Sequence, residues 1–218
     1  MSASVTDFDT QTFLTDLATE KVGRRFAGGF ERIAREMPHL DTQRRQCEEW
    51  ARTFSRETDK GLYLSGKTGS SKTALAAAIV IDLVSRGFGV EFSNVADLLA
   101  DVRASYDSDD VATEHEIVEE AAGVDLLVLD DLGAEKITEH SIGILERIID
   151  RRYRALKPIV ITSNLDGDAL YSEMGDFLNG QRLVSRLCEM VEGVALPARD
   201  MRVKKQTTKK EDHAGPRT

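Results

Sequence analysis

The sequence predicts an α/β fold in which a parallel β-sheet lies between two layers of helices. Short apolar runs alternate with longer segments of helical periodicity, the pattern of strand–helix–strand units. One run, VDLLVLDD at residues 124–131, is apolar almost throughout, as expected of a central strand buried on both faces. With 218 residues and 41% hydrophobic residues, the chain can bury one sizeable core.

The N-terminal part is expected to contribute an arm and one packed helix. Residues 1–21 are polar, with apolar positions enough for one short amphipathic helix but not for a core of their own. They predict a short arm that is available to a partner. A helix is expected from Asp41, as its N-cap, to position 54. Its inward face is formed by apolar residues spaced three and four apart, namely Cys47, Trp50, Ala51 and Phe54.

The elements that follow are expected to alternate between strand and helix. Their ranges are 61–66 (strand), 72–86 (helix), 89–93 (strand), 95–105 (helix), 124–131 (strand), 138–155 (helix) and 158–164 (strand). The acidic stretch 106–120 predicts an exposed loop that leads into a further helix. The basic residues 203–218 have the composition of a disordered tail.

Composition limits the classes of function. A net charge of −9 argues against a protein that coats DNA through its overall field, so contact with single-stranded DNA must be local, weak and strongly salt-dependent. No apolar run is long enough for a membrane span and no signal peptide is evident, which predicts a soluble, cytoplasmic protein without a membrane partner. Cys47 and Cys188 lack metal-ligand or redox spacing and are interpreted as reduced thiols.

The segment between the first strand and the second helix resembles a nucleotide-binding P-loop. It consists of Gly66, Lys67, Thr68, Gly69, Ser70, Ser71, Lys72 and Thr73. The P-loop pattern is Gly-x-x-x-x-Gly-Lys-Thr, and Ser71 replaces its second glycine. Backbone N–H groups and a helix N-terminus would hold the phosphates of ATP, Lys72 would reach the β and γ phosphates, and Thr73 would join the Mg²⁺ shell.

Further polar residues are expected at the same edge of the sheet. Asp130 is the candidate Mg²⁺ partner, and Asp131 could orient or deprotonate the attacking water. Asn164 could position that water, although ordinary turn chemistry would also account for it. Arg182 and Arg186 share a helical face, where solvation is the default and an arginine finger that reaches a neighbouring subunit is the alternative.

With GKTGSSKT, LLVLDDLGAEK, IVITSNL and GQRLVSRL in this order, the chain resembles AAA+ ATPases of the DnaC/DnaI helicase-loader group and the related IstB-like transposition helpers. The resemblance implies a three-layer P-loop NTPase domain over residues 22–202 with no full helical lid domain. By resemblance, residues 66–73 form Walker A, Asp130 and Asp131 form Walker B, and Asn164 is sensor 1. Arg186 becomes the arginine finger, and Arg202 is a candidate for sensor 2.

The resemblance also implies a function and partners. A loader of this group delivers a replicative helicase onto single-stranded DNA, as an ATP-hydrolysing homo-oligomer that forms on ATP or partner binding. Arg103 and Tyr106 are candidates for DNA contact, and a packed helix is the alternative for that segment. Two other functions remain open: a transposase accessory that acts on target DNA, and a weakly hydrolysing adaptor that nucleotide switches between conformations.

Ser71 raises a separate hypothesis. If its position must be left-handed, its Cβ costs about 1–2 kcal/mol and the loop is functional but detuned. Ser71→Gly is then expected to tighten ATP binding or speed turnover by up to roughly tenfold.

Overall fold

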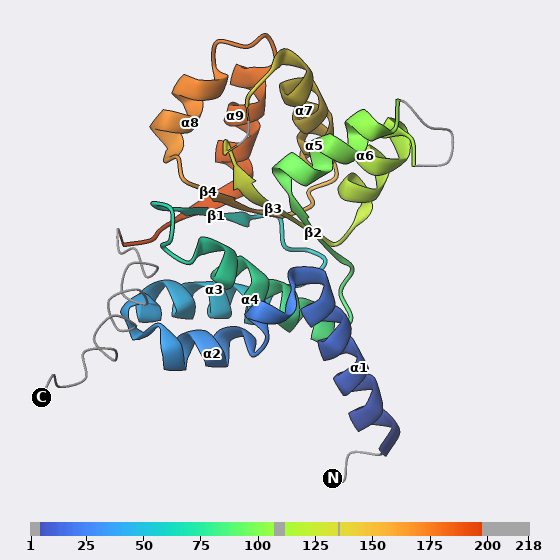
Figure 1. Ribbon diagram of the computed structural model, residues 1–218, viewed down its shortest axis with the longest axis vertical. Helices are drawn as coiled ribbons and strands as arrows, with labels where there is room; N and C mark the ends of the chain where they lie inside the picture. Colours follow the sequence, from blue (N-terminus) through green and yellow to red (C-terminus); the bar gives the residue numbers. More distant parts are fainter. Residues whose placement is uncertain (1–4, 107–111, 135, 198–218) are drawn as a thin grey trace, which may run out of the picture.

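Five parallel strands form the centre of the computed structural model, which describes residues 5–106, 112–134 and 136–197 (Figure 1). The strands are β1 (Gly61–Ser65), β2 (Val90–Asn94), β3 (Leu126–Leu132), β4 (Ile159–Ser163) and β5 (Val191–Ala195). Their order is β2-β3-β4-β1-β5, and each neighbouring pair is parallel. Their carboxyl ends therefore lie along one edge, where open α/β sheets bind ligands.

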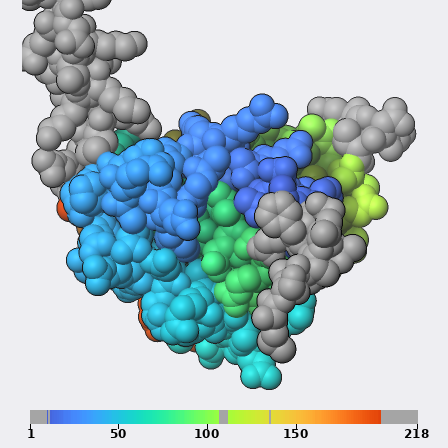
Figure 2. Space-filling model, turned by 90° about the horizontal axis from the view of Figure 1, so that it is seen from below, coloured from blue at the N-terminus to red at the C-terminus, as the bar shows by residue number. Residues whose placement is uncertain are grey.

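Helices cover both faces of this sheet (Figure 1). One layer holds α1 (Val5–Val22), α2 (Gly29–Glu36), α3 (Asp41–Thr53) and α4 (Lys72–Ser85), with short 3₁₀ turns at Arg24–Phe26 and Pro38–Leu40. The other layer holds α5 (Val95–Ala104), α6 (Glu114–Gly123), α7 (Glu139–Arg154), α8 (Gly167–Met174) and α9 (Gly180–Met190). Figure 2 looks onto the first layer, where the blue and cyan N-terminal helices form much of the visible surface.

Successive side chains of each strand point to opposite faces of the sheet, so the core is divided between the two helix layers. In β3, Leu126 and Val128 belong to the cluster beneath α1–α4, whereas Leu127 and Leu129 belong to the cluster beneath α5–α9. Helix α4 is buried along most of its length, because it lies between the sheet and the N-terminal helices. The predicted three-layer α/β fold with a parallel sheet is confirmed.

The N-terminal segment differs in detail from what the sequence predicts. The expected arm is helix α1, and its last turns pack on α4 with Ala18 and Val22 buried, so the second half of this segment belongs to the core. Asp41 is the first residue of α3 rather than its N-cap, because the turn Pro38–Leu40 leads directly into the helix. Helices α2 and α8 and the edge strand β5 are additional elements that the sequence analysis did not predict.

The C-terminal end of the described chain returns to the sheet. After α9, strand β5 pairs with β1, and no helical lid follows it within residues 136–197. Arg202 and the predicted tail at 203–218 lie outside the described residues. Among the helices of the described ranges, none is long and apolar enough to cross a membrane.

Candidate nucleotide site

Three neighbouring strand ends and one helix start bring the predicted phosphate-binding residues together. The loop 66–71 joins the end of β1 to Lys72, the first residue of α4. Asp130 and Asp131 lie near the end of β3, and Asn164 directly follows β4. Because β3, β4 and β1 are adjacent and parallel, these residues meet at one edge of the sheet.

Lys72 connects the loop to the end of β4. Its side chain is buried, and Nζ donates to the Gly66 carbonyl at 2.8 Å, to the Lys67 carbonyl at 3.3 Å and to Asn164 Oδ1 at 2.7 Å. The ammonium group is thus held by oxygen acceptors at the mouth of the loop. Phosphate oxygens are stronger acceptors for such a cation than neutral carbonyls, so the arrangement suits an anionic ligand.

Asp130 and Thr73 form the adjacent acidic part of the site. Thr73 Oγ1 donates to both carboxylate oxygens of Asp130, at 2.9 and 3.2 Å, and Thr162 Oγ1 donates to Oδ1 at 2.7 Å. Burial raises the pKa of Asp130, and the hydrogen bonds from Thr162 and Thr73 oppose this rise. The hydroxyl of Thr73 and the carboxylate of Asp130 are hard oxygen donors beside the candidate phosphate loop, and they fit Mg²⁺.

Asp131 sits in a β-bulge. Leu129 pairs with Ile161 and Leu132 pairs with Ser163, so two residues of β3, Asp130 and Asp131, lie opposite Thr162 alone. Asp131 has a φ of +60°, and its N–H donates to Thr162 Oγ1 at 2.9 Å. In a regular strand, successive side chains point to opposite faces of the sheet. Bulges change the direction of side chains next to active sites, and this bulge interrupts that alternation at Asp130 and Asp131.

The loop has the backbone conformations of an anion-binding nest. Gly69 has a φ of +83°, and Ser71 has φ and ψ of +73° and +28°, which is left-handed. The left-handed conformation considered for Ser71 is therefore observed. A residue with a Cβ carries a cost of about 1–2 kcal/mol in this conformation.

Arg186 is placed elsewhere, against α7. Its guanidinium pairs with Glu146 at 2.7 Å and with Asp150 at 2.5 Å and lies 5.7 Å from the ring centre of Tyr153. The side chain is only 17% exposed, whereas that of Arg182 is 64% exposed and lies 3.7 Å from Glu146. Of the two arginines that the sequence places on one face, Arg186 thus fastens α9 to α7 within the chain.

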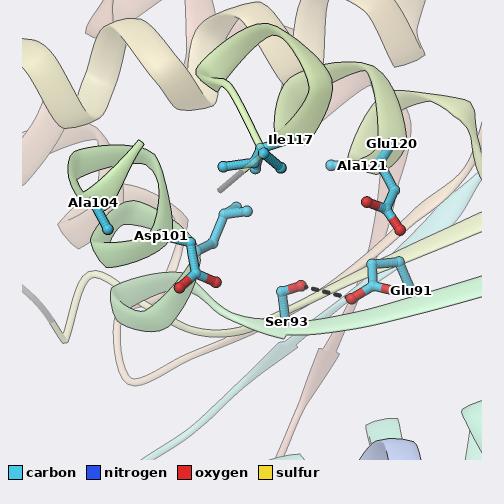
Figure 3. Close-up of a pocket in the computed structure, with 9 residues that line it drawn as sticks. Glu91, Ser93, Asp101, Ala104, Ile117, Glu120 and Ala121 are labelled. Atoms are coloured by element: carbon cyan, nitrogen blue, oxygen red, sulfur yellow. Dashed lines mark hydrogen bonds between the residues drawn. The ribbon is translucent and has the colours of Figure 1, made fainter. Parts of the chain in front are cut away.

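A separate cleft of about 310 Å³ lies between β2, α5 and α6 (Figure 3). Its lining includes the acidic side chains Glu91, Asp101 and Glu120, together with apolar ones, and Ser93 Oγ donates to Glu91 at 3.1 Å. An acidic lining repels phosphate groups. The loop at 66–73, which offers backbone N–H groups and a buried lysine, is therefore the candidate for a phosphate ligand, and this cleft is not.

The two candidates for DNA contact lie at the end of α5. Arg103 is exposed. Tyr106 is 55% exposed, but its hydroxyl contacts Glu114 and lies 3.4 Å from His140 Nε2. Tyr106 therefore connects the end of α5 to the starts of α6 and α7, and its role in DNA contact stays a prediction.

The sheet order, the loop and the acid pair together define a P-loop domain of the AAA+ type. The sequence model of the IstB-like ATP binding protein family matches residues 35–209, and the chain belongs to that family.

Similar proteins agree with this assignment. The replicative helicase loader DnaC of Buchnera aphidicola subsp. Baizongia pistaciae is 29% identical over 140 residues, which cover 64% of this chain and 54% of that protein. Among solved structures, DnaI superposes with a TM-score of 0.66 at 22% identity, over 80% of this chain and 90% of that one. The DnaC helicase loader gives 0.63 at 25% identity, over 73% and 90%. The chain spans about half the length of the curated relatives it matches.

One residue at the site was missed by the sequence analysis. Thr162 contacts both aspartates, yet it stands in a run of strand residues whose pattern indicates only burial. A buried hydroxyl needs a hydrogen-bond partner. The presence of a threonine on a buried strand, two positions before the predicted Asn164, is therefore the feature of the sequence that could have indicated its role.

Proposed function

We propose that the chain binds ATP with Mg²⁺ at the loop 66–73 and hydrolyses it to ADP and phosphate. The observation that carries this proposal is the convergence of Lys72, Thr73, Asp130 and Asn164 through direct hydrogen bonds. Backbone amides of the loop and the N-terminus of α4 would hold the phosphates. Bound Mg²⁺ would neutralise phosphate charge, and Thr73 and Asp130 would hold it.

The remaining residues act on the attacking water. Asp131 orients the water or accepts its proton, since the bulge fixes its backbone beside Asp130. Asn164 accepts a hydrogen bond from Lys72 in the described conformation. When phosphate oxygens accept the hydrogen bonds of the Lys72 ammonium group instead, the Asn164 side chain can turn to the γ phosphate or to the water. Ser71 leaves the loop functional, with a strained backbone at one position.

The proposed biological role is the loading of a replicative helicase onto single-stranded DNA during the initiation of DNA replication. Support comes from the similarity to proteins named helicase loader DnaC, in sequence and in fold. With a net charge of −9, DNA binding by this chain is weak and strongly salt-dependent.

A second candidate role is that of a transposase accessory acting on target DNA, which the match to the IstB-like family favours. A third is a weakly hydrolysing adaptor, which the strained Ser71 favours. Capture of a replicative helicase by the tagged chain in the presence of ATP supports the loader, and capture of a transposase under the same conditions supports the second role. Steady-state ATP hydrolysis with and without single-stranded DNA tests the third, because an adaptor shows little turnover in either.

Arg186 is proposed to complete the site of a neighbouring subunit in a homo-oligomer. To do so it must give up its pairs with Glu146 and Asp150, so assembly and the release of Arg186 are coupled. Mixing Arg186→Ala chains with Lys72→Ala chains should restore some hydrolysis, because one interface then combines an intact loop with an intact arginine. If confirmed mixed assemblies recover no activity, Arg186 is only the clamp between α9 and α7.

A further inference from the structure

Two neighbouring hydroxyls of β4 hold the bulge of β3 in place. Thr162 Oγ1 accepts the Asp131 N–H at 2.9 Å and donates to Asp130 Oδ1 at 2.7 Å. Ser163 Oγ donates to the Leu132 carbonyl at 2.6 Å and accepts the Leu165 N–H at 3.1 Å. The bulge interrupts the ladder of main-chain hydrogen bonds between β3 and β4. Both hydroxyls are fully buried, and they supply partners to main-chain groups there that would otherwise lack them.

The two hydroxyls differ in what they contact. Ser163 bridges main-chain groups that flank the site and also interacts with the Tyr63 hydroxyl, and its printed contacts include neither aspartate. Thr162 contacts the carboxylate of Asp130 and the backbone of Asp131, the residue with a φ of +60°. One hydroxyl thus fixes the side chain of one aspartate and the main-chain direction of the other. It leaves Asp130 able to accept from Thr73 through both oxygens.

We propose that Thr162 is a positioning residue for ATP hydrolysis: it sets the Asp130 carboxylate toward Thr73 and Mg²⁺ and holds the bulge that presents Asp131. This inference rests on the proposed ATPase function. Thr162 acts through the aspartates and does not itself contact the metal. Mutation of a residue that orients a metal ligand by a hydrogen bond typically lowers metal affinity or activity by about 10–100-fold.

The test compares Thr162→Val, which has nearly the same shape without the hydroxyl, with Thr162→Ser, which keeps it. Ser163→Ala is the matched control, because it also removes a hydroxyl bridge between β3 and β4 but touches neither aspartate. Each variant is measured for kcat and KM of ATP hydrolysis, for the Mg²⁺ concentration that half-saturates binding of a fluorescent ATP analogue, and for thermal melting.

Thr162→Val is expected to lower kcat and to raise the half-saturating Mg²⁺ concentration by about tenfold each, with KM changed less than about twofold. Thr162→Ser should stay within about twofold of the parent in every readout, and Ser163→Ala should lose stability without the Mg²⁺ shift. Parent-like Mg²⁺ dependence in folded Thr162→Val overturns the proposal, as does an equal shift in Ser163→Ala.

Three further outcomes concern the folding of the variant and the function on which this inference rests. If Thr162→Val does not fold, Thr162→Ser decides, because a tenfold loss in a variant that keeps the hydroxyl contradicts the proposal. If the parent binds the analogue but does not hydrolyse ATP, the proposed hydrolysis is wrong, and the Mg²⁺ titration still tests Thr162. A parent that binds no nucleotide overturns both.

Discussion

Replacing Ser71 by glycine should stabilise the fold more than it changes nucleotide binding. Ser71 has a φ of +73°, and relief of this conformation is worth about 1–2 kcal/mol for a residue with a Cβ. Against this gain, glycine loses more backbone entropy on folding than a residue with a Cβ, which costs about 0.5–1 kcal/mol of stability. From the middle of each range, the expected net gain in the free energy of unfolding is about 0.75 kcal/mol, or roughly 1.5–3 °C in Tm for a domain of this size.

The strain at Ser71 exists before any nucleotide is present, so it is common to the free and the bound states. ATP affinity should therefore change by less than about threefold, and the tenfold gain expected from sequence alone is an upper limit. The assays are thermal melting and titration with a fluorescent ATP analogue, both on parent and Ser71→Gly.

A control variant isolates the backbone effect. Leu156 has a φ of +52° at an exposed position after α7, so Leu156→Gly should raise Tm without changing ATP affinity. If Leu156→Gly raises Tm and Ser71→Gly does not, the reasoning on Ser71 is refuted. A tenfold gain in affinity would show that the serine Cβ crowds the phosphates.

Three further predictions follow from burial and from the acid pair. Arg152 is fully buried, and its guanidinium donates to main-chain carbonyls at the end of α6, in the turn that follows it and at Pro158. Arg152→Met should therefore lower the free energy of unfolding, measured with denaturant, by about 3 kcal/mol or more, and a loss below about 1 kcal/mol would contradict this. Burial raises the pKa of Cys47 to about 12, whereas Cys188 is exposed. A thiol reagent near neutral pH should therefore react with Cys188 alone until the chain is unfolded. Rapid reaction of both thiols in the folded chain would be inconsistent with the buried face of α3. Asp131→Asn should keep ATP binding and slow turnover, because the contacts of Asp130 remain; turnover at the parent rate would exclude Asp131 as the group that acts on water.

The sequence was sufficient for the layers and for the loop because both are local patterns. The apolar run of β3 and the mostly apolar surface of α4 predict burial on both sides, and the candidate phosphate-binding loop follows a motif within eight residues. The parallel sheet then places Asp130 and Asn164 near Lys72 without further information.

The features that the sequence did not reveal depend on contacts between distant segments. The role of Thr162 depends on the bulge, whose register is set by pairing between β3 and β4. The engagement of Arg186 depends on Glu146 and Asp150, which approach only when α9 packs on α7. Strand β5 is short and only partly buried, so its apolar pattern is weak and its existence depends on pairing with β1.

Nucleotide affinity of the parent and of Lys72→Ala tests the central claim most directly. Because Lys72 is the buried cation at the mouth of the loop, its removal should weaken binding of a fluorescent ATP analogue by at least about tenfold, the effect of one charge-assisted hydrogen bond worth about 1.5–3 kcal/mol. Lys67→Ala removes an exposed lysine from the same loop and should weaken binding by less than about threefold. Equal affinity in the parent and in a folded Lys72→Ala variant would contradict the assignment of residues 66–73 as the ATP site.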